Sequence, residues 1–206
     1  MVGFDTILIV MKVRIEKLKE KVRKDCENPN FFHHTWFYNY HLLIVEQIAL
    51  ELCNKYPEAD NEIVQSLVWL HDYGKIVDFD NQYKATIPYA KKLLAKLAFP
   101  KDIISKILSY IELYDKYKEQ DFRKVPLEVQ IVSSADGVSH LVGPFYYIYF
   151  YEYSDMSIDE LIRSNIEKAK RDWNKKIVLP EVKRAFKKRY DLFLEQMGKF
   201  PKKYVT

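Results

Sequence analysis

The stretch LVWLHDYGK, residues 67–75, ends an apolar run with two ionisable side chains and a glycine. Apolar residues recur before it at a spacing of three to four, which predicts a helix that begins near residue 60 or 61. His71 and Asp72 would occupy the last turn of this helix, and Gly74 is placed to end it. Because neighbouring side chains on a helix point about 100° apart, His71 and Asp72 cannot lie on one face. The pair therefore needs partners from distant parts of the chain.

The same helical spacing of apolar residues appears in segment after segment. Proline and glycine fall between these segments, and Pro180 suits the first position of the last one. The pattern predicts an all-α fold of about eight helices. Besides the helix that ends near Gly74, they cover residues 5–26, 35–55, 87–98, 101–116, 125–141, 158–173 and 180–197.

Composition supports one folded, helical domain. The 206 residues are 48% hydrophobic and 15% aromatic, which argues against disorder. Five glycines and eight prolines leave few of the turns that an all-β fold needs. This length predicts a single domain over residues 1–206, with a motif-bearing core at 35–140. The N-terminal helix within residues 1–30 and the basic C-terminal helices within 156–200 are expected to pack on that core.

The sequence contains no pattern typical of secretion or of a membrane span. Cys26 and Cys53 lie far apart without a CxxC pattern, and the first residues lack the layout of a signal peptide. The apolar run at residues 7–11 is much shorter than the roughly 20 residues that cross a bilayer. We therefore expect a reduced, cytoplasmic protein without a membrane segment.

Charge is unevenly distributed, although the total is only +4 at pH 7. Residues 163–206 contain 14 Lys or Arg and 5 Asp or Glu, so this part of the chain is basic. A solvated helix face is the favoured interpretation. Attraction of a phosphate-rich ligand or of nucleic acid is the alternative.

Ionisable side chains occupy three stripes that should be buried. His41 lies on the apolar stripe of the helix at 35–55, His71 ends the stripe of the next helix, and Asp136 lies on that of 125–141. A lone buried histidine is more often a hydrogen-bonded core residue, and a lone buried aspartate is often a cap or an ion-pair partner. Burial of several such groups needs compensation, by pairing, by neutralisation or by a bound metal ion.

Two imidazoles and two carboxylates form an N2O2 donor set. His41, His71, Asp72 and Asp136 together suit one divalent ion among Mn, Fe, Co, Ni, Zn and Mg better than an ion that prefers thiolates. Four protein ligands on a six-coordinate ion would leave two positions for a water and a phosphate oxygen.

The order of these residues resembles a known signature. His41, then HD at 71–72, then Asp136 within SSADGV (133–138), is similar to the H…HD…D signature of the HD-domain superfamily of metal-dependent phosphohydrolases. The pattern YHLLIVEQIALEL…NEIVQSLVWLHDYGK also resembles the second and third helices of that family. The resemblance covers residues 35–140. It implies an orthogonal all-α bundle, a divalent metal held by His41, His71, Asp72 and Asp136, and hydrolysis of a phosphoester or phosphoanhydride.

The resemblance also suggests roles and limits. Asp72 is expected to orient a water whose pKa the metal lowers. Lys75 completes an HDxGK pattern that implies a phosphate contact, and its alternative role is to complement the helix dipole. Tyr114 stands where branches with two metals have a histidine, so one metal is expected. Guanosine tetraphosphate hydrolases are expected to carry acidic residues after the HD pair, and deoxynucleotide monophosphatases a Glu at position 75, so the chain departs from both.

Other features are weaker candidates. His140, one helical turn after Asp136, could line the site, although a surface or core position is favoured. The aromatic segment at 144–153 could stack a nucleobase, but a core or subunit-interface position is favoured. His33 and His34 are expected to serve capping or packing. Asp78 and Asp80 could act as proton donors near the site, although a purely structural role in a turn is favoured.

Two classes of function remain. The favoured one is a metal-dependent phosphohydrolase that acts on a small phosphorylated molecule, a nucleotide above all, by a metal-activated water. The alternative is a non-catalytic, metal-containing regulatory or nucleic-acid-binding module. Retention of Lys75 beside a complete ligand set favours the enzyme. The sequence leaves open the natural substrate, the ion, the general acid and whether the chain forms a homo-oligomer.

Overall fold

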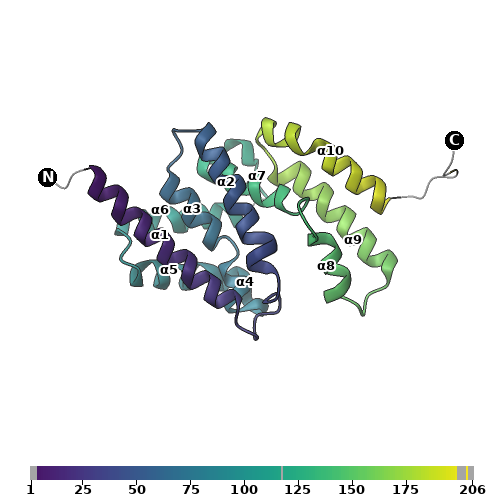
Figure 1. The fold of residues 1–206 in the computed structure, drawn as a ribbon, viewed down its shortest axis with the longest axis horizontal. Helices are drawn as coiled ribbons and strands as arrows, with labels where there is room; N and C mark the ends of the chain where they lie inside the picture. The colour runs from purple at the N-terminus through teal and green to yellow at the C-terminus, as the bar shows by residue number, and fades with distance from the viewer. Residues whose placement is uncertain (1–3, 117, 199–202, 204–206) are drawn as a thin grey trace.

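The computed structural model describes residues 4–116, 118–198 and 203, with side chains from residue 9 onward. No strand occurs in these ranges, and the prediction of an all-α fold is confirmed (Figure 1). Two π-helical turns adjoin regular helices: η1 (Tyr38–Leu42) precedes α2, and η4 (Asp172–Lys176) follows α9. The α-helices are α1 (Phe4–Cys26), α2 (Leu43–Lys55), α3 (Asn61–Leu70), α4 (Tyr73–Val77), α5 (Gln82–Lys96), α6 (Lys101–Asp115), α7 (Leu127–Ser139), α8 (Phe145–Glu152), α9 (Ile158–Arg171) and α10 (Pro180–Met197).

The helix that carries the HD pair begins at a side-chain cap. Asp60 has extended backbone angles (φ −72°, ψ 104°), and its carboxylate accepts a hydrogen bond from the backbone N–H of Ile63 at 3.2 Å. This bond satisfies one of the amide groups that a helix leaves without a partner in its first turn. Nearly all of α3 is buried, because α1, α2, α6 and α7 all pack against it.

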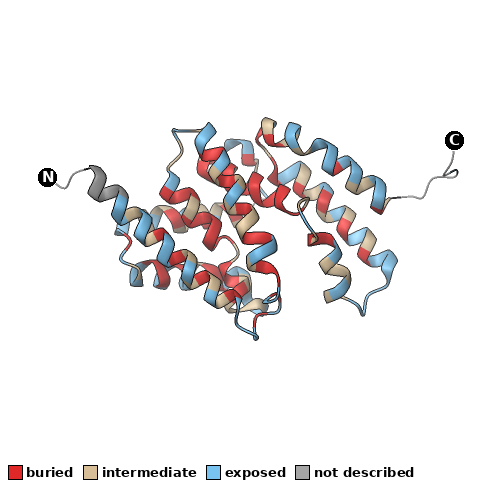
Figure 2. Ribbon diagram, viewed as in Figure 1, coloured by how far each residue is buried: buried red, intermediate tan, exposed pale blue. Residues whose placement is uncertain are grey.

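Helix α7 lies in the middle of the bundle and is buried almost along its whole length (Figures 1 and 2). It packs against α2, α3 and η4. Close packing depends on a small residue: a Cβ atom on Gly137 would lie 2.7 Å from Ile177 Cγ1. The position of α7 brings Asp136 to the centre of the protein, where it is 1% exposed.

The C-terminal helices form the side of the molecule away from α1 (Figure 1). Ser157 begins α9 with a capping box, in which its side chain and that of Glu160 each bind the other's backbone N–H. Pro180 occupies the first turn of α10 as predicted, and the rings of Trp173 and Tyr190 stack with centroids 4.2 Å apart. These contacts fix η4, which lies between α9 and α10, against α7.

Two features of the fold differ from the sequence predictions. The first is the end of the helix that carries the HD pair. Its predicted end at Gly74 is wrong, because α3 ends at Leu70 and Gly74 lies inside the short helix α4. Gly74 instead allows α4 and α5 to approach: a Cβ atom there would lie 2.1 Å from the carbonyl oxygen of Gln82. The second difference is α8, an additional helix within the aromatic segment, with Phe145 and Tyr146 buried and Tyr151 83% exposed.

One hydrophobic cluster extends from Ile15 in α1 to Tyr190 in α10. None of the helices in the described ranges is long and apolar enough to span a membrane. That residues 1–206 form a single domain stays a prediction.

Candidate metal centre

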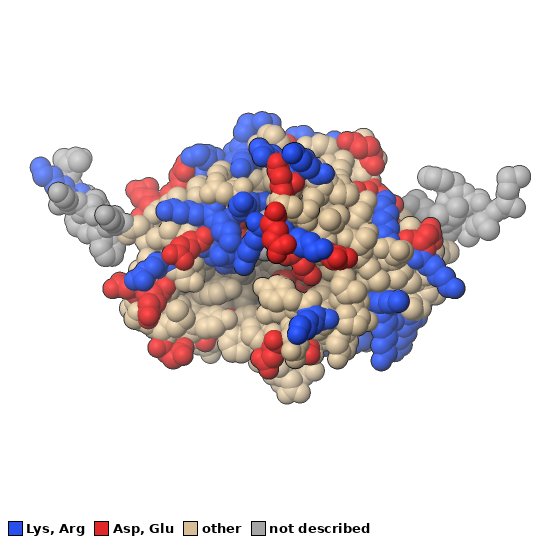
Figure 3. Space-filling view, turned by 180° about the vertical axis from the view of Figure 1, so that it is seen from behind, with Lys and Arg blue, Asp and Glu red and all other residues tan. Residues whose placement is uncertain are grey.

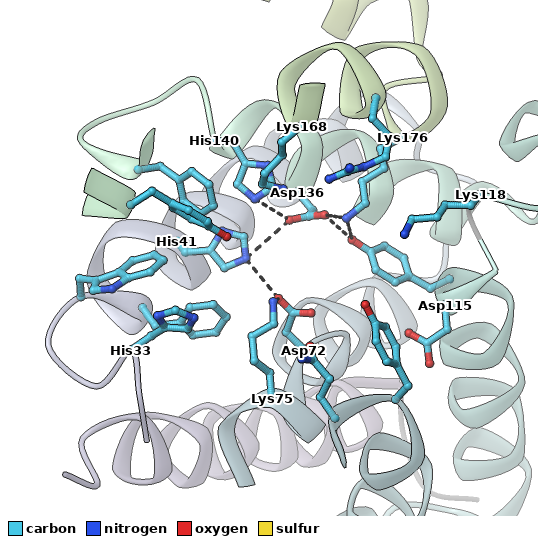
Figure 4. A pocket seen from close by; sticks show the side chains of 18 residues that line it. His33, His41, Asp72, Lys75, Asp115, Lys118, Asp136, His140, Lys168 and Lys176 are labelled. Atoms are coloured by element: carbon cyan, nitrogen blue, oxygen red, sulfur yellow. Dashed lines mark hydrogen bonds and ion pairs between the residues drawn. The ribbon is translucent and has the colours of Figure 1, made fainter. Parts of the chain in front are cut away.

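The ligand residues that the sequence predicts lie around one small space inside the bundle, and Figure 4 shows His41, Asp72 and Asp136 at this space. One ligand atom each of His41, His71 and Asp136 lies within 4.8 Å of the other two. Asp136 Oδ1 is 3.5 Å from His41 Nε2 and 3.9 Å from His71 Nε2. Asp72 Oδ2 completes the group at 3.8 Å from His41 Nε2 and 3.7 Å from His71 Nε2. Ligands about 2.1 Å from a common ion are roughly 3 to 4 Å apart, so these separations fit a divalent metal.

The HD pair converges because the chain leaves the helix between its two members. His71 keeps helical angles (φ −58°, ψ −32°), whereas Asp72 has φ −115° and ψ 17°. On a continued helix the two side chains would diverge by about 100°. The bend turns the carboxylate of Asp72 back toward the imidazole of His71, and α4 begins directly after it.

Hydrogen bonds to Nδ1 orient the imidazoles of His41 and His71 so that Nε2 of each ring faces the space. The hydroxyl of Ser139 donates to the carbonyl of Asp136 at 2.7 Å, so it accepts from His41 Nδ1 at 3.1 Å. His71 Nδ1 donates to the carbonyl of Val68 at 2.9 Å. The Nε2 lone pairs of His41 and His71 therefore face the space, and the buried Nε2 of His71 has no hydrogen-bond partner among the described residues. An unpartnered buried lone pair of this kind is what a metal ion would satisfy.

Comparison with known families agrees with this geometry. The sequence model of the HD domain matches residues 38–141, about half of the chain and nearly the core at 35–140 that the motifs predicted. The chain belongs to the HD domain family. No curated protein and no solved structure matches it. Membership supports a metal-dependent hydrolase in general terms and leaves the substrate undefined.

Protonation states in the HD domain also suit a metal. Burial alone would raise the pKa of Asp72, but Lys75 and His71 hold it far below its usual value. Burial would likewise raise the pKa of Asp136, but Lys176 and the neighbouring imidazoles together hold it well below its usual range. Burial lowers the pKa of His41. Charged carboxylates beside a neutral imidazole are the forms that bind metal ions.

The second oxygen of Asp136 is held by residues that the sequence did not assign to the site. Tyr114 and Lys176 both donate to Asp136 Oδ2, Lys176 at 2.5 Å, and the two donors are 3.2 Å apart. Oδ1 is thereby left to face the histidines. Tyr114 stood out in the sequence only as a replacement for a second-metal histidine. Lys176 lies 40 residues after Asp136 on η4, and no motif around it signals such a contact.

His140 belongs to the same wall of the site. It is 5% exposed, its Nε2 is 3.5 Å from Asp136 Oδ1, and its Nδ1 is 3.0 Å from Asp172 Oδ2. Lys168 also contacts Asp172 Oδ2, at 2.9 Å. His140 is therefore a buried core residue, as favoured by the sequence, and it also lines the pocket, which was the weaker alternative.

A pocket of about 210 Å³ opens onto the candidate metal centre. Lys75 lines it, with Nζ 2.6 Å from Asp72 Oδ2 and 5.5 Å from the ring centre of Phe37. Besides the three metal-centre residues His41, Asp72 and Asp136, its lining includes five cationic side chains: Lys75, Lys118, Lys168, Arg171 and Lys176. Such a surplus of cationic side chains favours an anionic ligand.

The remaining candidates have structural roles. His33 is buried and hydrogen-bonded to Glu152 at 2.9 Å, which confirms its predicted packing role, although it also lines the pocket. His34 is exposed, with Nδ1 2.9 Å from the carbonyl of Phe31. Asp78 caps the turn at 79–81, and Asp80 is exposed, so neither lines the pocket.

Proposed function

We propose that this HD-domain protein is a metal-dependent phosphohydrolase that cleaves a phosphoester or phosphoanhydride of a small molecule, with a nucleotide as the favoured substrate. The observation that carries the proposal is the convergence of His41, His71 and Asp136 within 4.8 Å, beside Asp72 and at the base of a pocket with surplus cationic side chains. A structural metal site has no need of an open, cationic pocket, whereas hydrolysis of a phosphate does.

The residues of the site divide the work of metal binding, water orientation and phosphate binding in this proposal. His41, His71, Asp72 and Asp136 would hold one divalent ion, which when bound supplies hydroxide near neutral pH and neutralises charge on phosphoryl oxygens. Asp72 accepts a hydrogen bond from Lys75 through Oδ2, and this bond fixes the plane of a carboxylate that orients the attacking water. The ammonium group of Lys75, which lines the pocket, would also contact a phosphate oxygen.

Pocket size and aromatic walls support a nucleotide whose phosphate end enters first. A volume of about 210 Å³ is below the roughly 300 to 1,000 Å³ of pockets that enclose a drug-sized ligand. The phosphate end would fill the interior, and the nucleoside would extend to the mouth, where Tyr83 is 73% exposed. Phe145 and Tyr149 of the aromatic segment also line the pocket, which supports stacking of a base, the weaker of the roles that the sequence suggested for this segment.

The test begins with metal analysis of the purified protein, followed by a phosphate-release screen over nucleotides and p-nitrophenyl phosphate with each candidate ion. Asp72→Ala is expected to lower the rate by about 10²-fold or more, since it removes the group that orients the water. Asp80→Ala is the matched control, because Asp80 is an exposed aspartate outside the pocket. Bound metal without turnover of any compound would refute the proposal.

The alternative, a metal-containing module that binds nucleic acid, is less well supported. Three basic residues of the C-terminal part, Lys168, Arg171 and Lys176, line the pocket instead of an outer face. On the face seen in Figure 3, acidic side chains are interspersed among the Lys and Arg side chains. Nucleic-acid binding that weakens steeply with salt, in a protein without phosphatase activity, would favour this alternative.

A further inference from the structure

The wall of the pocket formed by the end of α9 carries two cations that the proposed hydrolysis does not use. Lys168 and Arg171 are separated by three residues, so they lie on one face of α9, and both line the pocket. Figure 4 shows Lys168 and Lys75 on opposite sides of the gap between Asp136 and Asp72. A phosphate beside Lys75 therefore leaves the cations of α9 available.

Asp172 is the carboxylate that contacts this pair in the described part of the chain, and its Oδ2 is already well supplied with partners. Its Oδ2 contacts His140 Nδ1 at 3.0 Å and Lys168 Nζ at 2.9 Å. Arg171 Nε is 4.0 Å from Asp172 Oδ1, too far for a hydrogen bond. Both of these buried atoms have no hydrogen-bond partner among the described residues. The hydrogen bonds to Asp172 therefore come from His140 and Lys168, and none comes from Arg171.

The chemistry of Arg171 points to a phosphate. A guanidinium group has five N–H donors in a planar fork that matches two oxygens of a phosphate. In the described residues Arg171 donates no side-chain hydrogen bond, and its side chain is 40% exposed toward the pocket mouth. Lys168 adds a second positive charge one helical turn away, held in place by Asp172 and by Phe145, whose ring centre is 5.5 Å from Nζ.

The other cations in the interior have different partners. Lys75 Nζ is 2.6 Å from Asp72, and Lys176 Nζ is 2.5 Å from Asp136. These two lysines therefore serve the metal-centre carboxylates, next to the phosphate that would be attacked. Lys168, with Arg171 on the same face of α9, lies across the gap from Lys75 (Figure 4), where a neighbouring phosphate of the same ligand would fit.

We propose that Lys168 and Arg171 form a second anion subsite, which binds the phosphate next to the attacked one and selects diphosphates over simple monoesters. The inference rests on the proposed function, because the first phosphate is the one at the metal centre. In the reaction a water oxygen bonds to the attacked phosphorus, and the bridging P–O bond breaks with its electron pair on the leaving phosphate. The subsite binds that leaving phosphate, and the protons of the water pass to product oxygens or solvent.

Binding to metal-free protein tests the subsite without catalysis. Calorimetry would compare inorganic pyrophosphate with orthophosphate on the wild type, and pyrophosphate is expected to bind at least tenfold more tightly, the ratio that one charge-assisted bond provides. Arg171→Gln should weaken pyrophosphate about tenfold and leave orthophosphate unchanged, while Arg171→Lys restores part of the loss. Lys170→Gln is the matched control, with the same loss of charge on the exposed side of α9.

Kinetics on the metal-loaded protein provide the second measurement. Arg171→Gln should lower kcat/KM for a nucleoside diphosphate about tenfold and change that for p-nitrophenyl phosphate less than twofold. If Lys168 and Arg171 only neutralise Asp172, Arg171→Gln lowers the melting temperature and leaves both ligand preferences unchanged, and the subsite is refuted. Because Lys168→Gln leaves a buried carboxylate without its lysine, it is measured together with Lys168→Gln/Asp172→Asn, which restores the balance of charge.

The two proposals fail in different ways. Hydrolysis of p-nitrophenyl phosphate without any preference for pyrophosphate would overturn the subsite and keep the hydrolase. A preference for pyrophosphate that depends on Arg171, in a protein that hydrolyses nothing, would overturn the hydrolase and keep the anion site.

Discussion

Ser139 connects the hydrogen-bond network to the metal centre, and Ser139→Ala tests whether that network determines metal affinity. Its hydroxyl accepts from His41 Nδ1 at 3.1 Å and donates to the carbonyl of Asp136 at 2.7 Å, and the residue is fully buried. Without this acceptor the N–H of His41, which is 1% exposed, has no partner. The imidazole can then move its proton to Nε2, the nitrogen that faces the ligand space.

The structure sets the size of the expected effect. A buried donor that loses its acceptor costs about 1 to 3 kcal/mol. Loss of a group that orients a metal-bound histidine typically lowers metal affinity by about 10- to 100-fold, which corresponds to roughly 1.4 to 2.7 kcal/mol. The two ranges overlap, since both describe the single contact to His41. We therefore expect Ser139→Ala to weaken binding of Mn²⁺ or Zn²⁺ by about 10- to 100-fold.

The assay is calorimetric titration of metal-free protein, combined with urea unfolding. Ser134→Ala is the matched control: Ser134 is also a fully buried serine of α7, and its hydroxyl accepts from the backbone N–H of Val178 at 3.1 Å and Leu179 at 3.3 Å. The Ser134→Ala protein should lose about as much stability as the Ser139→Ala protein, and it should bind metal with the affinity of the wild type. Equal metal affinity of the Ser139→Ala and Ser134→Ala proteins would refute the role of the network.

Three further substitutions test packing and electrostatics. Asp115 lines the pocket, and burial raises its pKa to about 6, so the folded state favours the neutral carboxyl group. The contribution of this group to the free energy of unfolding is therefore fully present below pH 4 and is lost as the pH rises through 6. With a chelator present, Asp115→Asn should therefore raise the free energy of unfolding by on the order of 1 kcal/mol at pH 7 and change it little at pH 4. A lower melting temperature of the variant at pH 7 would contradict this prediction. Gly74→Ala, whose Cβ would lie 2.1 Å from the carbonyl oxygen of Gln82, should cost about 3 kcal/mol or more in urea unfolding. Gly137→Ala should cost less, about 1 to 2 kcal/mol, because the atoms nearest its Cβ would be side-chain atoms, Ile177 Cγ1 at 2.7 Å and Lys176 Cβ at 3.3 Å, rather than backbone. The reverse order of the two costs would show that the α4–α5 contact is looser than described.

The sequence predicted the candidate ligands because each lies at the end of a detectable pattern. His41, His71 and Asp136 continue apolar stripes, and an ionisable residue on such a stripe is conspicuous without any structure. Their convergence required the resemblance to the HD signature, since periodicity shows which face is buried but not which helices meet. Asp72 was found only through its neighbour His71, and the bend that makes it useful is invisible in the pattern.

Lys176, Arg171 and α8 were missed for physical reasons. Lys176 contacts Asp136 only because η4, which follows α9, docks on α7, a contact between segments 40 residues apart. The sequence showed that region only as an excess of positive charge, for which a solvated face was the favoured interpretation. Helix α8 is apolar on every side, so it has no periodic stripe, and the pattern could not separate it from a core segment of another kind.

Departures from regular helix geometry deliver most of the pocket's functional side chains. His41 lies in the π-helical turn η1, the HD pair lies at the bend between α3 and α4, and Asp172 and Lys176 lie in the π-helical turn η4. A π-helical turn accommodates an extra residue, which changes the direction of its side chains relative to the helix that follows. Among the four candidate ligands, Asp136 alone comes from the interior of a regular helix, and it is the residue that His41, His71, His140 and Lys176 all face. The site is therefore built as one fixed carboxylate in the rigid α7, with its partners brought to it by local irregularities, so substitutions that restore regular helix at η1 or η4 should damage the site more than the fold.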